Sequence, residues 1–177
     1  MPTTTELLLP YPALGDPPNV PLHLQQLAVA TNALLGQRGA WRQDTTGQSV
    51  STGTDTPVTF NTAAVAAVGL SYSGGVFTVS KTGRFHLKGS VTYPWVASLE
   101  MWAWLGPAST TTRWDLDTRT APASTGPPQT LKVDITRAFN NGDTFRLWTW
   151  HNRGSSATLD VSYGGTTHFE ATYLGAA

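Results

Sequence analysis

The 177-residue chain contains no cysteine, so disulfide bonds and thiolate chemistry are excluded. Charged residues are also scarce: they make up 12 % of the chain, and 11 basic residues balance 11 acidic ones. A neutral chain presents no basic face to a phosphate backbone, so nucleic acid is not expected as a partner. Because a surface this poor in charge tends to associate, we expect it to be partly hidden in an oligomer.

Long apolar runs are absent as well. None approaches the length of a transmembrane helix. The stretch MPTTTELLLPYP lacks a basic start and is interrupted by proline, so it is not expected to be a secretory signal. The 4 histidines show neither HxH nor HExxH spacing, so the sequence predicts no zinc site and no other cofactor.

Proline is abundant near the N-terminus, where it indicates an extended arm over residues 1–19. Asn19 can cap a helix that holds Pro21 in its first turn and stops at Gly36, so residues 20–36 are predicted to be helical. One stripe of this helix has coiled-coil spacing and consists of Val20, Leu24, Leu27, Thr31 and Leu34. Because so short a helix is marginal alone, it is a candidate coiled-coil neck between copies of the chain, or it packs on its own domain.

From Gly39 onward the apolar pattern changes to strict alternation. The segment GRFHLKGSVTY places Phe85, Leu87 and Val91 on one face and charged residues on the other. TLKVDITRAF and DTFRLWTWHN alternate in the same way, and glycine-rich turns such as SGG, KTG and NNGD separate the strands. This pattern predicts an all-β sandwich or barrel over residues 37–177.

Three segments, taken in order, resemble the trimeric jelly roll of the tumour necrosis factor family and of complement-type globular heads. They are GGVFTVSKTGRFHLKGSVTY, AFNNGDTFRLWTW and THFEATYLGA. The resemblance implies an all-β jelly-roll sandwich, preceded here by the short helix and the extended arm. It also implies a homotrimer.

The arm has a resemblance of its own. The matching residues are Tyr11, Pro12, Leu14, Asp16, Pro18, Asn19, Val20 and Pro21. They resemble the opening of many tail or structural proteins of actinobacterial phages. The resemblance implies that Tyr11, Pro12, Leu14, Asp16, Pro18 and Asn19 anchor the chain to a virion, at the tail or capsid surface, and that the β-head points outward. Release by lysis would then replace a secretory signal.

The chain has 7 tryptophans, which are the main indication of a binding surface. Trp102 and Trp104 share one strand face, as do Trp148 and Trp150. Exposed indole rings bind the C–H faces of sugars. Because the opposite faces of these strands are also apolar, the four can instead belong to the core or to a trimer interface. Two further tryptophans are the candidate glycan contacts at loop edges: Trp95, which lies near a strand end, and Trp114.

An acidic pair is the remaining candidate for site chemistry. Arg113, Asp115, Asp117 and Arg119 are predicted to share one strand face. Two carboxylates at this spacing could bind calcium or act on a glycoside. The flanking arginines favour a solvated ladder of charges instead. No nucleophile stands beside a base, so the sequence predicts no catalytic residue.

Together these features predict a non-enzymatic, homotrimeric virion structural protein. Its expected partners are itself, other virion proteins through the arm, and host-surface glycan, with no membrane insertion. Two alternatives remain. A capsid decoration protein would cement capsomers without binding a receptor. A carbohydrate-active enzyme would need Asp115, Asp117 or Glu100 in a cleft.

Overall fold

The computed structural model describes residues 24–27, 38–43, 47–65, 69–94, 99–109, 112–121, 126–159 and 167–176, and only the backbone of residues 62–65. The chain divides into two compact units, Met1–Gln37 and Arg38–Ala177. In the first unit, residues 24–27 are helical. No helix among the described residues combines the length and apolarity needed to span a bilayer.

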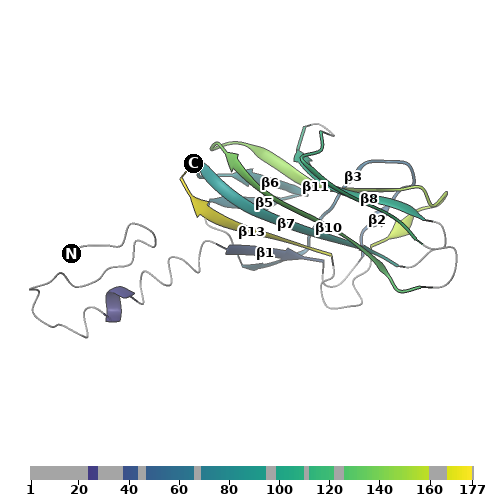
Figure 1. The fold of residues 1–177 in the computed structure, drawn as a ribbon, viewed down its shortest axis with the longest axis horizontal. Coiled ribbons are helices and arrows are strands. Elements are labelled where there is room, and N and C mark those ends of the chain that lie inside the picture. Colours follow the sequence, from purple (N-terminus) through teal and green to yellow (C-terminus); the bar gives the residue numbers. More distant parts are fainter. Residues whose placement is uncertain are drawn as a thin grey trace, which may run out of the picture. The chain divides into compact units, whose positions relative to one another are not determined.

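Two large antiparallel sheets and one two-stranded sheet form the second unit (Figure 1). The five-stranded sheet has the order β10 (Gln129–Phe139), β7 (Gly83–Tyr93), β13 (His168–Gly175), β1 (Arg38–Arg42) and β4 (Thr62–Val65). The six-stranded sheet has the order β5 (Leu70–Ser73), β6 (Val76–Val79), β11 (Thr144–His151), β8 (Glu100–Pro107) and β9 (Asp115–Thr120), with β3 (Thr56–Pro57) paired to β11. A separate pair consists of β2 (Ser49–Val50) and β12 (Ala157–Thr158). This strand content confirms the predicted all-β class.

Strand β7 follows the predicted alternation. Phe85, Leu87 and Val91 are buried, whereas Arg84 and Lys88 are exposed. The period of two therefore assigns the core face of this strand correctly, because successive side chains of a strand point to opposite sides of the sheet.

The core lies between the two sheets and is rich in aromatic rings. Phe77 of β6 lies 4.3 Å from Phe169 of β13 and 5.1 Å from Phe145 of β11, measured between ring centroids. Gly89 of β7 also faces this layer, and a Cβ there would lie 2.8 Å from side-chain atoms of Leu147 and Val133. A larger residue at this position would therefore force these side chains to shift.

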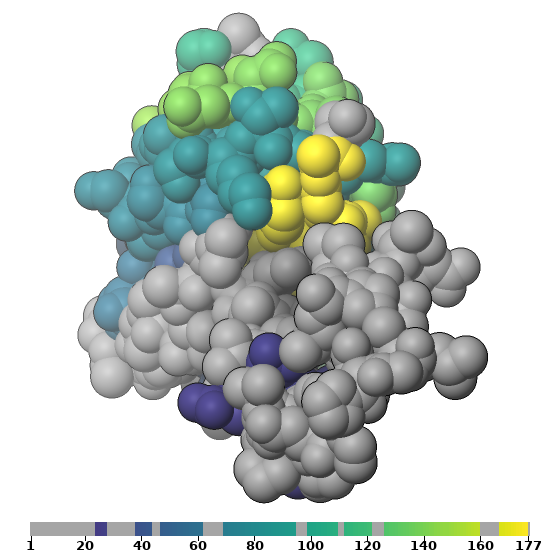
Figure 2. All heavy atoms as spheres, turned by 90° about the vertical axis from the view of Figure 1, so that its left-hand side faces the viewer, coloured from purple at the N-terminus to yellow at the C-terminus, as the bar shows by residue number. Residues whose placement is uncertain are grey.

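One end of the sandwich brings together three chain segments that are distant in sequence. Phe139, at the end of β10, pairs with Gly83, at the start of β7. Gly175, at the end of β13, pairs with Arg84. Figure 2 views the molecule from this side and shows the yellow C-terminal strand next to teal and green residues.

Candidate functional site

Four tryptophan side chains lie on the outer face of the six-stranded sheet. Trp102 and Trp104 are on β8, Trp148 and Trp150 are on β11, and the strand register pairs Trp104 with Trp148 and Trp102 with Trp150. The alternate residues of β8, such as Ala103, belong instead to the core between the sheets. We refer to Trp102, Trp104, Trp148 and Trp150 as the tryptophan ladder.

The two rungs of the ladder differ in exposure. Trp104 is 0 % exposed and Trp148 is 7 % exposed, although neither belongs to the core cluster. Their rings are stacked, with centroids 6.2 Å apart and planes inclined by 7°. Trp102 and Trp150 remain partly exposed, with centroids 4.7 Å apart. The pair of Trp102 and Trp150, called here the exposed rung, therefore offers an apolar aromatic surface to a ligand.

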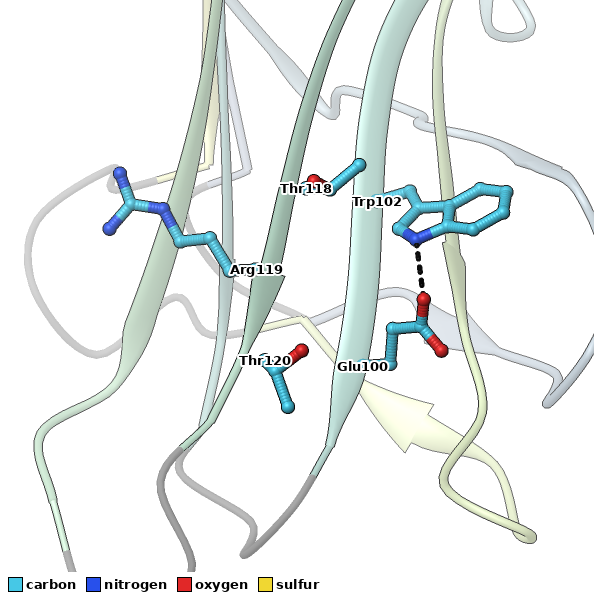
Figure 3. A pocket seen from close by; sticks show the side chains of 5 residues that line it. All are labelled: Glu100, Trp102, Thr118, Arg119 and Thr120. Atoms are coloured by element: carbon cyan, nitrogen blue, oxygen red, sulfur yellow. Dashed lines mark hydrogen bonds between the residues drawn. The ribbon is translucent and has the colours of Figure 1, made fainter.

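Polar groups border the exposed rung (Figure 3). The indole N–H of Trp102 donates to Glu100 Oε1 at 3.2 Å, and Asn152 Nδ2 donates to Glu100 Oε2 at 3.3 Å. In Figure 3, Arg119 points away from Trp102 and Glu100. A shallow pocket of about 280 Å³ opens here, and its lining consists of Glu100, Trp102, Thr118, Arg119 and Thr120. This border has the hydroxyl and carboxylate groups that recognise sugar hydroxyls.

Two arginines lie against the ladder. The Arg113 guanidinium is 4.5 Å from the ring centroid of Trp102 and 4.8 Å from that of Trp104. The Arg146 guanidinium is 5.4 Å from the ring centroid of Trp148. All three distances are in the range of cation–π contacts, so the ladder is a cationic as well as an aromatic surface.

A glycine allows the loop that carries Arg113 to approach the sheet. A Cβ at Gly106 would overlap the carbonyl oxygen of Thr112. The strand β9 begins only at Asp115, so Arg113 lies in a loop and does not share a strand face with the acidic pair. That part of the predicted charge ladder is wrong, because strand alternation does not extend into the loop.

The acidic pair of β9 bonds to the other sheet. Asp117 Oδ2 accepts a hydrogen bond from the backbone N–H of Lys132 at 2.8 Å, and Asp115 Oδ2 accepts one from the backbone N–H of Asp134 at 2.6 Å. Asp117 also forms an ion pair with Arg119 at 3.5 Å. In the described part of the chain, no three His, Asp or Glu side chains are grouped as a metal site. The two carboxylates therefore have a structural role: they accept hydrogen bonds from backbone N–H groups on the unpaired edge of β10.

Trp114 lies against the core. Its ring centroid is 5.6 Å from that of Phe139 and 6.2 Å from that of Phe145. Arg137 stacks on it at 4.5 Å, and both side chains line a second pocket of about 330 Å³. Trp114 is thus partly buried, and its ring contacts are with Phe139, Phe145 and Arg137 rather than with the tryptophan ladder. The other candidate glycan contact, Trp95, lies outside the described residues.

Burial shifts the pKa of two tyrosines. Desolvation raises the pKa of Tyr93 well above its ordinary value, and the side-chain hydrogen bond with Thr149 opposes this shift. Desolvation also raises the pKa of Tyr72. Both phenols pack among core aromatic residues. Neither is on the outer face with the ladder, so neither can exchange protons with a ligand bound there.

Little of the predicted arm and neck falls within the described residues. Leu24 and Leu27 are 61 % and 42 % exposed. The remaining neck residues, Val20, Thr31 and Leu34, and the arm residues, Tyr11, Pro12, Leu14, Asp16, Pro18 and Asn19, lie outside the described part of the chain.

Comparisons with known proteins bear on the fold. No family model and no curated protein matches the chain. Murine APRIL, in a crystal structure at pH 5.0, is similar with a TM-score of 0.57 and 16 % identity, covering 77 % of this chain and 99 % of that chain. Eiger TNF from S. frugiperda is similar with a TM-score of 0.57 and 18 % identity, covering 79 % of this chain and 93 % of that chain. These similarities confirm the predicted TNF-like jelly-roll fold.

The sequence predicted which tryptophans share a strand face but missed the rest of this site. Cross-strand pairing of Trp102 with Trp150 depends on the register of β8 and β11. Arg113 reaches the ladder from a loop, and no periodic signal marks such a residue. The position of Arg146 could have been predicted, because it lies two residues before Trp148 on β11 and therefore shares its face of the sheet.

Proposed function

We propose that this chain is a non-enzymatic structural protein of a phage virion, a homotrimer that docks through its N-terminal arm and binds host-surface glycan through its β-head. The virion role is supported by the resemblance of residues 11–21 to phage structural proteins. The binding role is carried by one observation: the partly exposed rung of Trp102 and Trp150 lies beside Glu100 on an open sheet face.

The exposed rung has the chemistry that a saccharide requires. A pyranose ring presents an apolar C–H face, which packs on an indole, and hydroxyls at its edge. Glu100 can accept hydrogen bonds from such hydroxyls, and the exposed Thr118 and Thr120 can donate or accept them. The site is open and shallow, as expected for a receptor that meets a polymer on a cell surface.

Self-association is supported by the helical residues 24–27. Leu24 and Leu27 are exposed apolar side chains three residues apart on one face of a helix. Burying a leucine side chain contributes about 1.5–3 kcal/mol, so two exposed leucines favour a partner helix.

An enzymatic role has less support. Retaining glycosidases need two carboxyl groups about 5 Å apart, and inverting ones about 6.5–9.5 Å apart. Asp115 and Asp117 accept hydrogen bonds from the backbone of β10. Glu100 pairs with Thr120 of β9. Thr120 is three residues from Asp117 on this strand, so Glu100 and Thr120 lie on the sheet face opposite to Asp117. Glu100 therefore does not share the ladder's face with Asp115 or Asp117.

Two measurements test the proposal. Particles released on lysis of cells that carry the gene should contain this chain by mass spectrometry, and antibody to the head should label their surface in electron micrographs. Purified protein should bind an oligosaccharide panel, and Trp102→Ser with Trp150→Ser should abolish this binding while the trimer persists. Particles without the chain would overturn the virion role. A double variant that becomes monomeric would make the ladder a subunit interface instead.

A further inference from the structure

The buried rung of the tryptophan ladder is bracketed by positive charge. Arg113 lies over Trp104, Trp104 stacks on Trp148, and Arg146 lies over Trp148. A guanidinium that stacks on an indole uses its face for this contact and keeps its N–H edges available. Those edges match the two oxygens of a carboxylate or a phosphate.

No acidic side chain of the described residues pairs with either arginine. The basic members of the ion pairs found in the described ranges are Arg38, His86, Lys88 and Arg119. Glu100, which is on the same sheet face, already accepts hydrogen bonds from Trp102 and Asn152. The positive charge at the buried rung is therefore uncompensated within the described part of the head.

The same rung has donors that lack acceptors. The indole N–H groups of Trp104 and Trp148 and the Nε–H of Arg146 are buried without a hydrogen-bond partner in the described structure. A buried donor left without an acceptor is costly, so native proteins rarely keep one. Three such donors on adjacent strands make this region rich in N–H groups and poor in oxygen acceptors.

We infer that the ladder binds an acidic saccharide, a sugar that carries a carboxylate or a phosphate group. This inference rests on the glycan binding proposed above and names its ligand class. The sugar ring packs on Trp102 and Trp150, and its anionic group lies toward Arg113 and Arg146. The anion supplies the negative charge that Arg113 and Arg146 lack among the described residues.

Polarity along the ladder sets the orientation of the ligand. Arg146 lies opposite Gly106 at one end of the paired segment of β8 and β11, and Glu100 lies beyond Trp102 at the other end. A carboxylate at Glu100 disfavours the anionic group there, because like charges repel. The neutral hydroxyl edge of the sugar therefore faces Glu100, and the acidic substituent faces the arginines.

The experiment compares matched pairs of oligosaccharides on the full-length protein by isothermal titration calorimetry. One pair is oligogalacturonate and its methyl ester, in which the charged carboxylates are replaced by neutral ester groups. The other pair is pentamannose phosphate and the same pentamannose after phosphatase treatment. We expect the charged member to bind about tenfold more tightly in at least one pair. The pair that shows the preference identifies carboxylate or phosphate as the recognised group.

Four variants assign the effect to residues. Arg113→Gln and Arg146→Gln should each reduce the preference for the charged member by about fivefold, and raised salt should reduce it in the wild type. Arg137→Gln is the matched control, because Arg137 also stacks on a tryptophan at 4.5 Å but contacts Trp114. Arg146→Lys keeps the charge and should retain part of the preference, which guards against misfolding of the glutamine variant.

Each outcome has a separate meaning. Equal binding of charged and neutral members overturns the acidic class and leaves glycan binding intact. A preference that survives both glutamine variants also overturns the inference, because the anion would then bind elsewhere. Absence of binding to every oligosaccharide overturns the proposed glycan role together with this inference.

Discussion

The phenol oxygen of Tyr93 lies 2.7 Å from the hydroxyl oxygen of Thr149 in the buried layer between the sheets. The Thr149 hydroxyl donates to the backbone carbonyl of Trp102 at 3.0 Å, so its only proton is used and Tyr93 is the donor to Thr149. Tyr93 belongs to β7 and Thr149 to β11. This relay connects one sheet to the backbone of the tryptophan ladder in the other.

The relay predicts unequal effects of removing its two hydroxyls. Tyr93→Phe removes a donor and leaves Thr149 bonded to Trp102, so it should lower the free energy of unfolding by about 1 kcal/mol. Thr149→Val leaves the Tyr93 hydroxyl buried without an acceptor and should cost about 2–3 kcal/mol. Urea unfolding monitored by fluorescence measures both. Because the double variant has no orphaned hydroxyl, it should be more stable than Thr149→Val alone; a purely additive double variant would contradict the relay.

Burial of Tyr93 also predicts a loss of stability at alkaline pH. Desolvation raises the pKa of this phenol above the ordinary value of 10.0. The unfolded chain therefore loses the proton first as the pH rises, and ionisation favours unfolding. The contribution of protonated Tyr93 to the free energy of unfolding is intact below about pH 10. It declines above this pH by at most about 1.4 kcal/mol per pH unit.

Urea unfolding of the wild type and Tyr93→Phe between about pH 8 and 11 measures this dependence. The variant should lose stability less steeply than the wild type above pH 10. Some decline should persist in the variant, since burial raises the pKa of Tyr72 as well. Identical slopes would show that Tyr93 does not contribute.

The bonds from Asp115 and Asp117 predict that these residues stabilise the closure of the sandwich. Asp115→Ala and Asp117→Ala should each lower the free energy of unfolding by about 1 kcal/mol, because each leaves a backbone N–H of β10 without its charged acceptor. This loss of stability is modest because both carboxylates are partly exposed.

Differential scanning calorimetry of the wild type with calcium or with EDTA should give the same melting temperature. A calcium-dependent rise that Asp117→Ala removes would support the metal alternative.

The exposed leucines of the helix predict that the neck contributes to assembly. Light scattering should give a mass three times that of one chain, both for the full chain and for a chain that starts at Gly39. The reason is that the resemblance to trimeric heads implies that the head assembles by itself. Leu24→Asp with Leu27→Asp should loosen the neck, seen as faster proteolysis near these residues, while the mass stays trimeric. A monomeric double variant would assign assembly to the neck alone. Monomers throughout would remove the trimer from the proposed function.

Several local features could be predicted because they depend on neighbours in sequence. Alternation in β7 identified Phe85, Leu87 and Val91 as core residues. The NNGD turn joins β10 to β11, with the Asn140 N–H donating to Asp143 Oδ2 at 2.7 Å. Turn chemistry and the period of two are encoded within a few residues, so they can be read without tertiary information.

The sequence by itself determined the all-β class, the inward and outward faces of the long strands, and the pairing of tryptophans on one face of each strand. Only the tertiary structure decided which strands became neighbours. It brought Trp102 next to Trp150 across β8 and β11, and placed Arg113 over Trp102. It also directed Asp115 and Asp117 toward the backbone of β10. These contacts join residues far apart in the chain, and their choice depends on register and sheet packing, which no local pattern encodes.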